Sequence, residues 1–259
     1  MAREYLLALD AGHGLGTPGK RCLKSLDPNE TSEWWLNDRV CRYIAQRAAQ
    51  YEGFKTLRVD DTTGKTDVSH KERCRRANAA KADVYHSVHH NAGILGGSGG
   101  GLVAFCMRGA TGAKVIRDGL YKALIAAGAL KGNRASPVLE KNFNVLVWSD
   151  MPAVLVEYGF MDSSTDVPVI LTEEYAKLVG CATADWYAKY WGLSLIETEK
   201  VEEEPEMTKY NTIEEVPDWG KATIQKLVDS GALKGTENGL ELSEDMLRIL
   251  VILDRLGKL

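Results

Sequence analysis

Hydrophobic and polar positions follow two different periods along the first 194 residues. Short apolar or alternating runs typical of strands cover residues 4–10, 54–59, 83–90, 100–107 and 152–160. Apolar residues at helical spacing cover residues 32–50, 69–81, 112–128 and 172–192. Strands that alternate with helices of this length are typical of βαβ units. The pattern therefore predicts an α/β fold, a twisted, mostly parallel sheet flanked by helices on both faces.

The pattern changes after residue 194. Residues 195–207 include "ETEKVEEEPE", with six glutamates and one lysine, which predicts a charged linker. Residues 208–259 contain two apolar-periodic segments, 216–231 and 242–257, and predict a small, mainly helical C-terminal module. The expected organisation is thus a domain at 1–194, a linker at 195–207 and a module at 208–259.

Composition excludes several classes of protein. The chain has a formal net charge of -4 and no Lys/Arg stripe interleaved with aromatic residues, so we expect no nucleic-acid partner. No apolar run approaches the length of a membrane span, and the first run is too short for a signal peptide. We therefore expect a protein made in the cytoplasm without a signal peptide and without a membrane partner. Five cysteines without CxxC spacing predict reduced thiols.

Candidate catalytic residues lie where the predicted strands end. His13 follows the first strand, His89 ends the strand at 83–90, and Glu157 ends an apolar strand where an unpaired carboxylate is costly. Glu33 begins the helix at 32–50. Because adjacent side chains on a strand point to opposite faces, His89 and His90 cannot both face one site. The carboxyl ends of parallel strands share one edge of a sheet, so we expect these candidates to lie near one another.

Two histidines and a carboxylate can bind zinc and leave one coordination position for water. A further carboxylate beside them can act as the base of a zinc hydrolase. The ordinary alternatives stay open: a histidine at a strand end is often a hydrogen-bonded core residue, and Glu33 could only stabilise its helix. Cys22, between the candidate ligands, is a less favoured ligand. The glycines of "LALDAGHGLG" lack the following helix and GK[ST] of nucleotide-binding loops.

Four segments occur in a characteristic order, and their sequences are "DAGHG", "SEWWLN", "ERCRRANAAKADVYHSVHHNA" and "MPAVLVEYGFMDSSTD". Over residues 4–192 the chain resembles the zinc-dependent N-acetylmuramoyl-L-alanine amidases, the catalytic domains of many phage endolysins and bacterial autolysins. The resemblance implies one catalytic Zn2+ held by His13, Glu33 and His89, with Glu157 as the catalytic base. Glu30 is the alternative to Glu33.

Three further positions take interpretations from the resemblance. It places His90 at a variable position, as a substrate contact or as a hydrogen-bond donor behind the ligands. Arg73 and Asn78 match a segment that we interpret as helix packing.

The resemblance also implies a substrate. We expect hydrolysis of the amide between N-acetylmuramic acid and the L-alanine of the stem peptide in bacterial peptidoglycan. A phage endolysin is favoured over a host autolysin, acting on the cell wall after release from the cell. The alternatives are a zinc peptidase that cuts within the stem peptide and a non-catalytic wall-binding protein.

The C-terminal module resembles, less specifically, the small cell-wall-binding modules that follow such amidases, which implies a secondary wall polymer as a second partner. A pair of helices that serves dimerisation alone is the alternative. The segment 242–257 is apolar on nearly every side, so we expect it to be buried by self-association, making the protein at least a dimer. Met207 follows glutamate codons that could mimic a ribosome-binding site, which suggests a second translation start.

Overall fold

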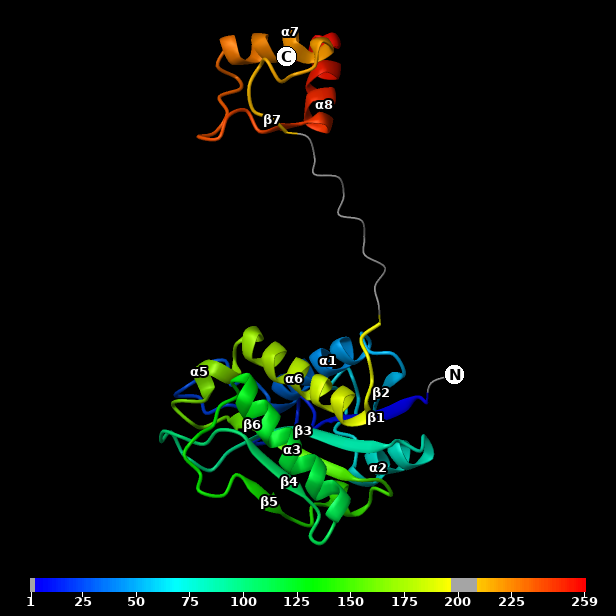
Figure 1. Ribbon diagram of the computed structural model, residues 1–259. Coiled ribbons are helices and arrows are strands. Elements are labelled where there is room, and N and C mark those ends of the chain that lie inside the picture. Colours follow the sequence, from blue (N-terminus) through cyan, green and yellow to red (C-terminus); the bar gives the residue numbers. More distant parts are fainter. Residues whose placement is uncertain (1–2, 197–208) are drawn as a thin grey trace. The chain divides into compact units, whose positions relative to one another are not determined.

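The structure, a computed structural model, describes residues 3–196 and 209–259 (Figure 1). The chain divides into two compact units at residue 196, and each is described by itself. Met207 and the part of the predicted linker from residue 197 on lie outside the described residues.

A six-stranded sheet forms the centre of the first unit, in the order β2-β1-β3-β6-β4-β5. Its strands are β1 (Tyr5–Ala11), β2 (Phe54–Arg58), β3 (Val84–Asn91), β4 (Val103–Cys106), β5 (Val138–Glu140) and β6 (Ala153–Phe160). The strands β2, β1, β3 and β6 are parallel to one another, and β4 pairs with β6 antiparallel. The predicted mostly parallel sheet is confirmed, and the carboxyl ends of β1, β3 and β6 share one edge.

Helices cover both faces of this sheet, as the sequence pattern predicts. They are α1 (Glu33–Ala48), α2 (His70–Ala79), α3 (Thr111–Ala127), α4 (Asn144–Val147), α5 (Val167–Ile170) and α6 (Glu173–Trp191). The helices α1, α3 and α6 bury their apolar residues in one core with one face of the strands, whereas α2 and α4 contribute to a second core on the other face. Figure 1 shows α1 and α6 side by side over the sheet.

Side-chain alternation along β1 separates these two cores. Leu7 and Leu9 pack into the core with α1 and α6, while Ala8 packs into the core with α2. Leu155 of β6 belongs to the same core as Ala8. The next residues on this face, at the carboxyl ends of the strands, are therefore directed to the α2 side of the sheet.

Some short elements are not predicted by the sequence pattern. The strand β5 has three residues, and α4 and α5 have four each, too few to show a hydrophobic period. The backbone of β5 instead pairs with β4, and Val145 and Leu146 of α4 are buried in the core with α2. Tertiary contacts, rather than local sequence, define β5 and α4, and residues 142–145 form one wall of the candidate site.

The second unit contains β7 (Lys209–Tyr210), α7 (Asp218–Asp229), β8 (Leu242–Ser243) and α8 (Glu244–Arg255), with β7 and β8 paired antiparallel. Both helices are predicted by the sequence, and the two-stranded sheet is not. Leu247 and Val251 of α8 are buried in a small core with α7. No helix in the described parts of the chain is long and apolar enough to span a membrane.

Candidate active site

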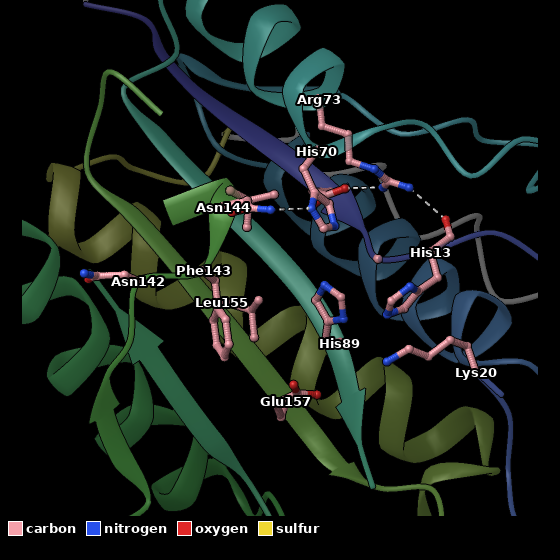
Figure 2. A pocket seen from close by; sticks show the side chains of 13 residues that line it. His13, Lys20, His70, Arg73, His89, Asn142, Phe143, Asn144, Leu155 and Glu157 are labelled. Atoms are coloured by element: carbon pink, nitrogen blue, oxygen red, sulfur yellow. Dashed lines mark hydrogen bonds and ion pairs between the residues drawn. The ribbon is translucent and has the colours of Figure 1, made fainter. Parts of the chain in front are cut away.

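A cavity of about 350 Å³ opens at the carboxyl ends of β1, β3 and β6, on the face that α2 covers (Figure 2). It is lined by Asp10, Gly12, His13 and Lys20, by His70 and Arg73 of α2, by His89 of β3, by residues 142–145, and by Leu155 and Glu157 of β6.

His13 and His89 line this cavity, and Glu33, which is not part of its lining, lies against both of them. One nitrogen or oxygen atom each of His13, Glu33 and His89 lie within 4.8 Å of one another. His13 Nε2 is 3.4 Å from Glu33 Oε2, and His89 Nδ1 is 2.8 Å from Glu33 Oε1. The rings of His13 and His89 meet edge to face, with centroids 5.0 Å apart. Residues from three distant parts of the sequence thus form one cluster.

Glu33 is held at this cluster by the start of α1. Ser32 caps the helix, with its hydroxyl accepting a hydrogen bond from the Trp35 N–H. The Glu33 carboxylate is 1 % exposed, and its Oε2 has no hydrogen-bond partner in the described structure. Burial opposes ionisation, but the hydrogen bond with His89 and the nearby positive charges hold the pKa of Glu33 below its usual range. Glu33 is therefore a buried carboxylate with one oxygen available to a ligand.

His13 occupies a strained backbone conformation that a buried cation supports. Its φ of 66° lies in the left-handed region, which is uncommon for a residue other than glycine. Arg73, which is 1 % exposed, donates hydrogen bonds to the carbonyl oxygens of Ala11 and His13 at 2.7 and 2.9 Å. Arg73 also pairs with the buried Asp10. Our interpretation of Arg73 as helix packing is therefore incomplete, because its guanidinium holds the backbone that carries His13.

Gly12 allows the ring of His89 to approach the end of β1. A Cβ atom at position 12 would overlap the imidazole ring of His89, so any side chain there would displace this ring. The carbonyl of Gly12 accepts a hydrogen bond from Asn37, and Asn37 Oδ1 is 2.8 Å from His90 Nδ1. His90 is 3 % exposed and does not line the cavity, so it is no substrate contact. His90 instead contacts Asn37, which in turn holds the Gly12 carbonyl next to the cluster.

Glu157 lies beside the cluster on the neighbouring strand. It is the register partner of His89 between β3 and β6, and Figure 2 shows the two residues next to each other at the cavity. Its Oε2 is shielded from solvent and has no hydrogen-bond partner in the described structure. Burial raises the pKa of Glu157 to about 7. A carboxylate with this pKa can both accept and release a proton near neutral pH.

Two alternative ligands lie outside this cluster. Glu30 forms an ion pair with Lys24 at 3.2 Å, and Cys22 is a buried core residue whose N–H bonds to the Thr31 carbonyl. Burial raises the pKa of the Cys22 thiol to about 12, which opposes formation of a thiolate ligand. Neither Glu30 nor Cys22 belongs to the His/Glu cluster that the structure forms.

Sequence reasoning missed several residues that line or support the cavity. Lys20 and residues 142–145 carry no periodic signal, because they lie in loops and short elements. Asp10 could have been found from the sequence, because a carboxylate inside an apolar strand requires a buried partner. Arg73, Tyr85 and Ser87 supply the hydrogen bonds to its two oxygens.

Comparison with known proteins identifies the family of the first unit. The family described as N-acetylmuramoyl-L-alanine amidase matches residues 7–186. The endolysin of Bacillus phage SPP1 is 30% identical over 197 residues, which are 73% of this chain and 66% of that protein. An uncharacterised Bacillus subtilis protein, YqiI, is 27% identical over 185 residues, or 71% and 83% of the two chains.

Solved structures share the fold as well. The N-acetylmuramoyl-L-alanine amidase from Clostridium difficile 630 superimposes with a TM-score of 0.65 at 25% identity, covering 74% of this chain and 98% of that one. The catalytic domain of the CD27L endolysin, which targets Clostridium difficile, superimposes with a TM-score of 0.53 at 20% identity. The match covers 70% of this chain and 98% of the CD27L chain. With the family match covering most of the first unit, the chain belongs to the N-acetylmuramoyl-L-alanine amidase family.

Proposed function

We propose that His13, Glu33 and His89 bind one catalytic zinc ion. Two imidazole nitrogens and one carboxylate oxygen are a donor set that zinc prefers in catalytic sites. Ligand atoms 2.0–2.1 Å from a tetrahedral ion are about 3.4 Å apart, and His13 Nε2 and Glu33 Oε2 have this separation. The unpartnered Glu33 Oε2 supports the proposal further, because a buried carboxylate oxygen without a donor is costly unless a cation binds it.

Glu157 acts in this proposal as the general base and acid. When bound, zinc acidifies water and polarises a carbonyl oxygen. Glu157 accepts a proton from the attacking water and then delivers it to the departing amide nitrogen. Its raised pKa suits both steps, since the same group must lose and regain the proton in one turnover.

The bond cleaved is the amide between N-acetylmuramic acid and the L-alanine of the stem peptide. The observation that carries this proposal is that the cavity is lined by Glu157 and by two members of the cluster, His13 and His89, in a chain that belongs to this amidase family. A zinc peptidase that cuts within the stem peptide would use the same groups on a different amide. The products, rather than the site, distinguish the two reactions.

Labelling of new amino ends tests the proposal. Purified peptidoglycan is digested with the protein, and the released amino groups are labelled and identified. We expect new L-alanine amino ends, no such ends with Glu157→Gln, and loss of the signal with a zinc chelator that is reversed by added Zn2+. New amino ends on another stem residue would instead establish a peptidase.

We also propose that the protein is a lysin whose second unit binds a wall polymer. The likeness to the phage SPP1 endolysin supports the lysin role. Removal of residues 197–259 should leave soluble-substrate cleavage intact and reduce sedimentation with purified walls. Walls stripped of their secondary polymers should bind both forms equally weakly. Equal binding of both forms to intact walls would contradict the role of the second unit.

The second unit should also pair with a second copy of itself through α8. Met246, Ile249, Ile252 and Leu256 form an apolar stripe, and each is about half exposed or more. The first turn of α8 is acidic and its last turn carries Arg255, so an antiparallel pair places opposite charges together.

Light scattering tests this pairing. We expect a dimeric mass for the full chain at tens of micromolar and a monomeric mass for Ile249→Asp. A monomeric mass for the unmodified chain would contradict the pairing.

We further propose that translation from Met207 supplies free modules. The intact gene should then yield a second, shorter product that Met207→Leu abolishes, and a single product would remove this proposal.

A further inference from the structure

Lys20 is fixed beside Glu33 by its own backbone. The Lys20 carbonyl accepts a hydrogen bond from the Glu33 N–H at 2.8 Å, and the Cys22 N–H donates to the Thr31 carbonyl at 2.8 Å. Arg21 and Ser32 form an isolated bridge between these two hydrogen bonds. The loop after β1 therefore pairs with the start of α1, which fixes the Lys20 backbone beside Glu33, and the Lys20 side chain lines the cavity.

The ammonium of Lys20 lies near the cluster but forms no hydrogen bond with it. Nζ is 3.7 Å from Glu33 Oε2, which is an ion-pair distance but longer than a hydrogen bond. The side chain is 43% exposed, and Figure 2 shows it extending toward the cavity from the side of His13. No hydrogen bond engages Nζ among residues 3–196 and 209–259. Its three N–H donors remain available to a ligand.

Arg73, the other Lys or Arg side chain of the cavity wall, is already engaged. Its guanidinium donates to Asp10 and to the carbonyl oxygens of Val68, Ala11 and His13. It cannot turn toward a substrate without abandoning the backbone of β1. Lys20 is therefore the cation of this cavity wall whose N–H groups remain available to a substrate.

We propose that Lys20 is a catalytic residue, whose ammonium donates a hydrogen bond to the oxyanion that forms during amide hydrolysis. This inference rests on the proposed function. Water adds to the carbonyl carbon, one of its protons passes to Glu157, and the carbonyl π electrons move onto oxygen, where Lys20 stabilises the negative charge. The carbonyl then re-forms, the C–N bond breaks, and the proton on Glu157 passes to the nitrogen. Preorganised donors aimed at such an oxyanion are among the largest contributions to catalysis.

The position of Lys20 favours the oxyanion over a more distant group of the substrate. It lines the same cavity as His13, His89 and Glu157, and its Nζ is 3.7 Å from Glu33 Oε2. An ammonium in this cavity wall lies among the groups that would surround the reacting carbonyl. A carboxylate on a later residue of the stem peptide would lie farther from these groups.

Lys20→Met tests the proposal, with Lys24→Met as the matched control. Lys24 is on the same loop but is 75% exposed and pairs with Glu30. With a soluble muropeptide, we expect Lys20→Met to lower kcat by about 10²- to 10³-fold, with KM changed by less than about threefold. Lys20→Arg should recover most of the activity, and Lys24→Met should match wild type.

Two readouts besides activity accompany the kinetics. Zinc content of Lys20→Met should equal that of wild type. Its affinity for a phosphonate analogue of N-acetylmuramoyl-L-alanine, whose tetrahedral oxygens mimic the oxyanion, should fall by a factor similar to that in kcat.

Three results would overturn the inference. Loss of zinc from Lys20→Met would show that Lys20 only supports Glu33. A raised KM with unchanged kcat would show that Lys20 binds another part of the substrate, and unchanged kcat and KM would remove any role. Failure of the wild-type protein to release L-alanine amino ends would instead reject the proposed function, and the two failures are therefore distinguishable.

Discussion

Two histidine clusters lie on opposite faces of β3, and they differ in how completely their polar atoms are paired. His86 is fully buried, with Nδ1 3.0 Å from the Tyr187 hydroxyl and Nε2 3.0 Å from the Tyr158 hydroxyl, which in turn bonds to Thr183. Both ring nitrogens of His86 are therefore satisfied. On the other face, His89 meets carboxylates, and Glu33 Oε2 and Glu157 Oε2 have no hydrogen-bond partner in the described structure.

The difference separates a stabilising network from a functional one. A complete buried network strengthens the fold, whereas an incomplete one costs free energy that the rest of the fold must offset. Burial lowers the pKa of His86 to about 3, so this ring stays neutral and fixed at physiological pH. Burial also raises the pKa of Glu157, which keeps a proton exchangeable there. One cluster holds the sheet to α6, and the other is available for chemistry.

The largest expected effect is that of removing the proton-accepting carboxylate of Glu157. Glu157→Gln keeps the shape of the side chain but cannot accept a proton, so kcat should fall by about 10²- to 10⁴-fold. Zinc content, measured by elemental analysis, should stay equal to that of wild type. Loss of zinc together with activity would place Glu157 among the ligands instead.

A substitution of Gly12 should disturb the cluster of His13, Glu33 and His89 through packing alone, without removing a ligand. Gly12→Ala places a methyl group into the His89 ring, so zinc affinity should fall by at least about tenfold, measured by competition with a chelator. Gly16→Ala is the matched control, since no atom lies within 4 Å of a Cβ there. Equal zinc affinities for the two variants would mean that the ring can move without consequence.

A substitution of His86 breaks the complete network and leaves the other cluster intact. His86→Phe keeps an aromatic ring, slightly larger than imidazole, but removes the hydrogen-bond partner of the Tyr187 hydroxyl and one of the two partners of the Tyr158 hydroxyl, which should destabilise the first unit by about 1–3 kcal/mol. Urea unfolding measures this change, and zinc stoichiometry should stay the same. Reduced zinc binding would show that the two faces of β3 are coupled.

The smallest effect concerns the dependence of stability on pH. His86 has its pKa lowered to about 3 in the folded protein, against 6.5 in the unfolded chain, so the unfolded chain binds more protons between these values. Stability should therefore fall as pH decreases below about 6.5, by up to about 1.4 kcal/mol per pH unit from this residue. Urea titrations at pH 7 and 5, with a chelator to exclude metal loss, should show a shallower decrease for His86→Phe. Identical decreases would assign the pH dependence to other groups.

The alternation of β3 explains why much of the site follows from the sequence. His89 and His90 are adjacent, so one faces the cavity and the other faces Asn37, as strand geometry requires. The carboxyl ends of parallel strands then bring His13 and Glu157 to the same edge. These relations depend only on side-chain period and strand direction, both of which leave a pattern in the sequence.

Other features leave no such pattern. The left-handed backbone of His13 cannot be expected of a histidine, and it depends on hydrogen bonds from Arg73, 60 residues away. The wall at residues 142–145 is placed by β5 and α4, which are too short to have a period. Lys20 lies in an irregular loop whose path is set by its pairing with the start of α1. In each case distant contacts decide the geometry.

The zinc stoichiometry of two neighbouring variants tests the central claim most directly. His89→Gln and His90→Gln introduce the same side chain at adjacent positions of one strand, and the amide introduced by His90→Gln can still bond to Asn37. Elemental analysis of the purified proteins should give one zinc ion per chain for wild type and His90→Gln, and less than about a tenth of that for His89→Gln. Equal loss of zinc from both variants, or its retention in His89→Gln, would contradict the assignment of the cluster as the metal site.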